Sequence, residues 1–184
     1  MLGWLVRWRL AKFERDFDYD LSYARDIYDA SPRAFFRFSR ISAMAAHREG
    51  VSREAWFAAK LTATLTEDCG PCTQLVVTMA EREGVSPSEL RAIVAGDERA
   101  MSPDAALGVR FARSVLNRDI AGAEEFRREV VSRWGQKGLV SLALTIAAAR
   151  VFPSVKYALG HGKACTRIRV AGTDTAVGKH AGAA

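Results

Sequence analysis

The hydrophobic positions of this chain recur at the spacing of α-helices. Residues three or four positions apart share one face of a helix, whereas a half-buried strand alternates apolar and polar residues. Two stripes with the helical spacing are Leu107, Phe111, Val115 and Leu116, and Val140, Leu144, Ala147 and Val151. We find no run with strict alternation, so the pattern predicts an all-α protein.

Serine, proline and glycine residues predict where the helices begin and end. A serine can cap the free amides of a helix, a proline fits its first turn, and a glycine tolerates the left-handed conformation that ends it. One helix is expected to start at Ser31-Pro32 and reach about Gly50, and the next to start at Ser52 and reach about Thr66. Two further starts are expected at Ser86-Pro87 and Ser102-Pro103. The expected stops are Gly84, Gly96, Gly135 and Gly160.

The two ends of the chain have distinct patterns. A first helix is expected over about residues 2–17, and we favour packing on the core over a membrane surface because acidic residues follow it at once. Residues 139–152 form a helix that is apolar nearly all round, which Pro153 should kink or end. From about residue 166 the chain is rich in Gly, Ala and Thr, which predicts a tail that is mobile or lies on a neighbour. We therefore expect one domain over residues 1–184, with an N-terminal helical extension over 1–30 and the tail over 166–184.

Composition excludes several classes of protein. The chain has 184 residues and a formal net charge of +6, with basic residues scattered and without a nucleic-acid-binding pattern. The most apolar run, residues 139–149, is closed by Arg150 and falls short of the ~20 residues of a membrane helix. The N-terminal residues lack the uninterrupted apolar core of a secretory signal. We expect a cytoplasmic protein that binds neither nucleic acid nor membrane.

Two of the three cysteines form a Cys69-Gly70-Pro71-Cys72 tetrad. In a reducing compartment such a pair is typical of thiol redox chemistry or metal binding, and an inert buried pair is the plain alternative. Zinc would require a Cys3His set completed by His161 and Cys165, about ninety residues further on. Structural zinc sites usually use close local pairs, so we expect no metal.

The residues around the tetrad can tune its thiols. Pro71 predicts a helix over about residues 71–82 with Cys69 just before it, where free amides and the helix dipole stabilise a thiolate. Cys72 lies within one turn and can resolve a mixed disulfide at Cys69. Glu67 and Asp68 precede the pair and either act as general acid and base or disfavour the thiolate, depending on burial.

The chain resembles the carboxymuconolactone decarboxylase family, in its alkyl hydroperoxide reductase D-like branch. The resemblance covers about residues 55–160 and consists of four features in order: a helix leading into Thr66-Glu67-Asp68-Cys69-Gly70-Pro71-Cys72-Thr73-Gln74-Leu75, the segment Gly84-Val85-Ser86-Pro87-Ser88-Glu89-Leu90, the segment Ala105-Ala106-Leu107-Gly108-Val109-Arg110-Phe111-Ala112, and the apolar helix after Gly138. Thioredoxins share the tetrad, but there it follows a strand, and here it follows a helical pattern.

The resemblance implies an all-α, alkyl hydroperoxide reductase D-like multi-helix bundle that assembles into homo-oligomers and reduces peroxides. In that branch the second cysteine attacks the peroxide and the first resolves, whereas the dipole argument favours the first, so the roles stay open. The chain also departs from the family. It has Phe57, Val76 and Pro71 where family members carry a glutamate or a histidine.

We therefore expect a thiol-dependent oxidoreductase, an antioxidant peroxidase or disulfide reductase, that needs no cofactor. Cys69 and Cys72 would cycle between dithiol and disulfide, Glu67 would move the proton with Asp68 in reserve, and a dithiol would return the electrons. The alternative is a non-catalytic oligomeric family member with remnant cysteines. Lactone decarboxylation ranks below both, because the acid–base groups it needs are missing.

Overall fold

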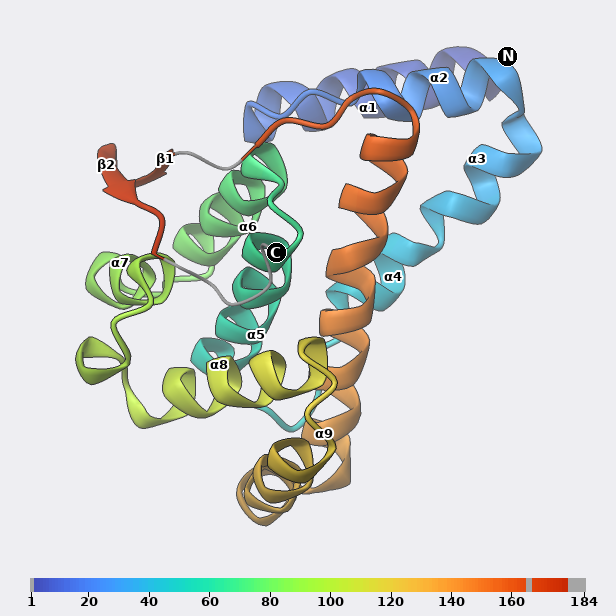
Figure 1. Ribbon diagram of the computed structural model, residues 1–184. Helices are drawn as coiled ribbons and strands as arrows, with labels where there is room; N and C mark the ends of the chain where they lie inside the picture. Colours follow the sequence, from blue (N-terminus) through green and yellow to red (C-terminus); the bar gives the residue numbers. More distant parts are fainter. Residues whose placement is uncertain (1, 165–166, 179–184) are drawn as a thin grey trace.

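The computed structural model describes residues 2–164 and 167–178, and most of them are helical (Figure 1). The elements in chain order are α1 (Leu2–Phe17), α2 (Ser22–Ala30), α3 (Pro32–Ser39), α4 (Ile41–Ala46), α5 (Arg53–Thr66), α6 (Gly70–Arg82), α7 (Pro87–Ala95), the 3-10 turn η1 (Glu98–Ala100), α8 (Pro103–Leu116), α9 (Ile120–Ala158), β1 (Arg167–Val170) and β2 (Thr173–Ala176). The helical class expected from the sequence is confirmed.

The expected capping serines lie at helix starts. Ser31, Ser52, Ser86 and Ser102 each accept a hydrogen bond from the backbone N–H three residues on. Each such bond satisfies one of the amides that a helix start leaves free. The four glycines expected to stop helices all have φ between +68° and +80°. The local signals therefore predicted most helix boundaries correctly.

Helix α5 forms the centre of the core, and every residue from Ala55 to Leu65 is buried. It packs against α8, α9 and α6. The approach of α8 is so close that a Cβ added to Gly108 would lie 2.4 Å from the carbonyl oxygen of Ala55. Only glycine fits there without moving the backbone of one helix.

Helices α1 to α4 form an arm that wraps one side of this core (Figure 1). Val6, Tyr19, Leu21, Tyr23, Ala24 and Phe35 form its buried cluster, which also includes Leu75 of α6 and Val155 of α9. The sequence predicts one helix from Pro32 to about Gly50, but the structure divides it at Arg40 and ends it at Ala46. Ser39 Oγ donates to the carbonyl of Phe36, a local bond that competes with regular helix geometry.

Helix α9 is interrupted at Gly135, where the sequence predicts a stop, but it continues past Pro153, where the sequence predicts a kink or an end. Gly135 is non-helical, with φ 68° and ψ −174°, and the segments on either side run in different directions (Figure 1). Pro153 does not end the helix, which continues to Ala158. Pro153 removes one backbone donor, and next to it Ser154 Oγ donates to the carbonyl of Arg150.

Among the described residues, α9 is the one helix long and apolar enough to cross a membrane by length and composition. Its most apolar window is 44% buried inside the protein, and core helices of soluble proteins pass the same test. The sequence predicts that the apolar run ends at Arg150, but the helix that carries it continues to Ala158.

Residues 167–176, within the segment that the sequence predicts to be a tail, form a β-hairpin. Strands β1 and β2 pair antiparallel, with Arg167 opposite Ala176. Ile168 and Val170 are buried against α6 and α7. Two apolar side chains on one face, four residues per strand, are too short a pattern to stand out in the sequence. Residues 179–184 of the expected tail lie outside the described part of the chain.

Candidate functional site

The cysteine tetrad lies at the start of α6, as the sequence predicts. The chain leaves α5 through Glu67 and Asp68, and Asp68 adopts a positive φ of 49°. Aspartate is one of the few side chains that accept this conformation readily. Cys69 is the N-cap residue of α6, and its carbonyl accepts the first helical bond from Thr73 N–H.

Cys69 and Cys72 are joined by a disulfide, with a Cα–Cα distance of 5.3 Å. Both are buried, but they face different surroundings. Cys69 has no exposed surface, whereas Cys72 is 4% exposed and lines a cavity. A small molecule that enters the cavity therefore meets Cys72 and not Cys69.

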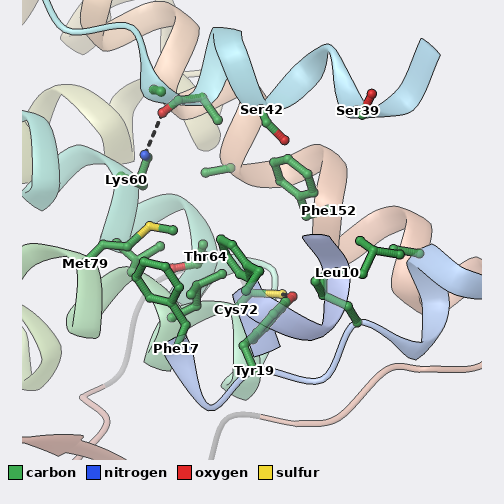
Figure 2. Close-up of a pocket in the computed structure, with 18 of the residues that line it drawn as sticks. Leu10, Phe17, Tyr19, Ser39, Ser42, Lys60, Thr64, Cys72, Met79 and Phe152 are labelled. Atoms are coloured by element: carbon green, nitrogen blue, oxygen red, sulfur yellow. Dashed lines mark hydrogen bonds between the residues drawn. The ribbon is translucent and has the colours of Figure 1, made fainter. Parts of the chain in front are cut away.

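The cavity has a volume of about 680 Å³ and lies between the N-terminal arm and helices α5 and α6 (Figure 2). Its walls are mostly apolar and include Leu10, Phe17, Met79 and Phe152. Ligand cavities in proteins typically measure ~300–1,000 Å³ and combine apolar walls with a few polar groups. The arm therefore completes a site that the core alone would leave open.

Two residues near Cys72, Tyr19 and Lys156, are not among the site residues predicted from the sequence. The Tyr19 hydroxyl lies 3.9 Å from Cys72 Sγ, within the range of a hydrogen bond to sulfur. Lys156 Nζ donates to the same hydroxyl at 3.4 Å and lies 4.7 Å from the centroid of the Tyr19 ring. Because the hydroxyl oxygen accepts from Lys156, its own hydrogen can point toward the sulfur or toward Tyr23, whose side chain also hydrogen-bonds Tyr19.

Burial shifts the pKa of both residues. It raises the pKa of Tyr19 well above its ordinary value, so the phenol keeps its proton at neutral pH. It lowers the pKa of Lys156, which makes this ammonium a readier proton donor than an exposed lysine. The pair therefore offers Cys72 a neutral hydrogen-bond donor with a cation behind it.

Comparison with known proteins gives no family. No family model, no curated protein and no solved structure matches the chain. Function is therefore inferred from the geometry of the site.

The two carboxylates expected to serve the cysteines lie away from the cavity. Glu67 forms an ion pair with Arg150, with 2.5 Å between Oε1 and Nε, and does not line the cavity. The Asp68 residue is exposed, and its carbonyl oxygen accepts a hydrogen bond from Tyr157. Their proposed part in proton transfer stays a prediction from sequence.

The residues of the zinc alternative are only partly described. Cys165 lies outside the described residues, and Cys69 and Cys72 are joined in the disulfide rather than free as ligands. His161 Nε2 lies 2.7 Å from Asp26 Oδ2. Within residues 2–164 and 167–178, no group of three or more His, Cys, Asp or Glu side chains could hold a metal ion.

Proposed function

We propose that the protein is a thiol oxidoreductase that reduces hydroperoxides, with Cys72 as the attacking thiol and Cys69 as the resolving thiol. One observation carries this assignment: of the two cysteines, Cys72 lines the cavity and contacts a phenol, whereas Cys69 is fully buried. A thiol must reach its substrate to attack it, and a resolving thiol needs only to reach its partner.

The reaction follows from this placement. The Cys72 thiolate attacks one oxygen of the peroxide, the O–O bond breaks, and an S–O bond forms to give a sulfenic acid. The leaving alkoxide takes a proton relayed through Tyr19 from Lys156 and departs as an alcohol. The Cys69 thiol then displaces water from the sulfenic acid and forms the disulfide. An external dithiol reduces this disulfide and is itself oxidised.

The relay from Lys156 through Tyr19 takes the place of acid–base groups that are missing elsewhere. Phe57 and Val76, which stand where relatives in the resembled family carry a glutamate and a histidine, both line the same cavity as Cys72. That arrangement supports the resemblance, because these positions face the reactive thiol. We therefore also propose that α5 to α9 correspond to the alkyl hydroperoxide reductase D-like bundle.

Assembly into a homo-oligomer in the cytoplasm is part of the same proposal. Val140 on α9 is 49% exposed and Ile120 at its start is 86% exposed. Such apolar surface on a long helix suits a contact with a second copy. Light scattering of the purified protein measures the mass directly, and a monomer at micromolar concentration would contradict this part.

Peroxide consumption with a dithiol reductant tests the activity. Wild type, Cys72→Ser and Cys69→Ser are compared with tert-butyl hydroperoxide and dithiothreitol. We expect turnover by wild type, none by Cys72→Ser, and a single oxidation of Cys69→Ser followed by slow recycling. Equal rates in all three proteins would favour the non-catalytic alternative.

A further inference from the structure

The cavity wall contains a buried amine, that of Lys60 on α5. The residue is only 6% exposed. Its Nζ donates to the carbonyl oxygen of Ala45 at 2.6 Å, near the end of α4, and lies 3.7 Å from the centroid of the Trp56 ring (Figure 2). These contacts hold the amine in the cavity wall.

The amine forms no ion pair among the described residues. An ammonium has three donors, and the carbonyl of Ala45 takes one of them. Glu83 also lines the cavity and attracts the ammonium electrostatically, but its carboxylate is paired with Arg48 at 3.0 Å. A buried charge without a partner is costly, and burial accordingly lowers the pKa of Lys60 to about 7. An anion entering the cavity would remove this cost.

The amine and the cysteine pair lie along the same wall. Cys69 N–H donates to the carbonyl of Thr64, and Thr64 lines the cavity one helical turn from Lys60. Four residues of α-helix span ~6 Å, so Lys60 and Thr64 lie about one turn apart along α5, and Cys72 lines the same cavity from α6. Ser39 and Ser42 line the cavity from exposed positions and mark its rim.

We propose that the cavity binds an elongated aliphatic carboxylate, with its carboxylate on Lys60 and its chain along the apolar wall past Cys72. One consequence rests on the proposed function: the physiological substrate is such an acid carrying a hydroperoxide on its chain. Cys72 thiolate takes the distal oxygen, the chain retains a hydroxyl, and the carboxylate is unchanged. Small peroxides lack both the charge and the chain that the site recognises.

Calorimetric binding at pH 6.5 tests the site without the chemistry. The Cys72→Ser protein is titrated with dodecanoic acid and with its methyl ester, which has the same chain and no charge. We expect the acid to bind at least tenfold more tightly than the ester. Lys60→Met should remove this difference. The control Arg9→Met, which removes a cation from the exposed rim of the same cavity, should keep it.

Equal affinities for acid and ester in the Cys72→Ser protein would overturn the inference, and that comparison needs no substitution at Lys60. Loss of the difference in Arg9→Met instead of Lys60→Met would overturn the assignment to Lys60. The proposed function fails separately: tight binding of the acid without any peroxide turnover by wild type would refute the redox activity and support the binding site. Turnover of fatty-acid hydroperoxide and its methyl ester at equal kcat/KM would refute the substrate class alone.

Discussion

Removing the Tyr19 hydroxyl is the perturbation that most directly probes the surroundings of Cys72. A hydrogen bond to an ionised group contributes ~1.5–3 kcal/mol. The O···S distance of 3.9 Å is long for such a bond, so we take a value near the lower limit, ~1.4 kcal/mol. That value corresponds to about a tenfold smaller thiolate population at neutral pH. Tyr19→Phe should therefore slow alkylation of Cys72 about tenfold at pH 7.

The assay is iodoacetamide alkylation followed by mass spectrometry, in a Cys69→Ser, Cys165→Ser background that leaves Cys72 as the reactive thiol. Tyr28→Phe is the matched control, because Tyr28 lies in the same arm and packs on Phe35 without contacting the cysteines. Its rate should equal that of the background protein. An unchanged rate in Tyr19→Phe, or an equal loss in Tyr28→Phe, would refute the reasoning.

Three further results are expected. Glu67→Gln should keep the rate of peroxide reduction within about a factor of two if the relay runs through Tyr19, and a hundredfold loss in the same assay would restore Glu67 as the acid–base group. Gly108→Ala should lower the free energy of unfolding by ~1–3 kcal/mol in urea, because the new Cβ meets the backbone of α5 at 2.4 Å, and a change below ~0.5 kcal/mol would contradict that contact. Dodecanoic acid should bind more weakly as pH rises above about 7, because Lys60 loses its proton there, and a constant affinity from pH 6 to pH 8.5 would contradict this dependence.

The local part of the structure was predictable from sequence. The capping serines, the stop glycines and the position of Cys69 at the head of α6 each depend on neighbouring residues, and all are observed. The β-hairpin was not predictable in this way. Its turn uses Ala171 and Gly172 at positive φ, and alanine is not a residue that signals such a turn.

The cysteines of the site were predictable from sequence, but the residues that contact them were not. The two cysteines are three positions apart in the sequence, but the hydroxyl that contacts Cys72 comes from Tyr19, 53 positions earlier. The cation behind it, Lys156, lies 137 positions from Tyr19. A tyrosine between two aspartates and a lysine near the end of a long helix carry no local pattern that joins them. Only the packing of the arm on α6 and α9 brings them together, and it leaves Glu67 outside.

The central claim is that Cys72 is the thiol that attacks peroxide. It is tested by treating the fully reduced Cys69→Ser and Cys72→Ser proteins with one equivalent of hydroperoxide in the presence of dimedone, which traps sulfenic acids, and locating the adduct by mass spectrometry. We expect rapid labelling at Cys72 in the first protein and none at Cys69 in the second. Labelling at Cys69 with an unreactive Cys72 would contradict it.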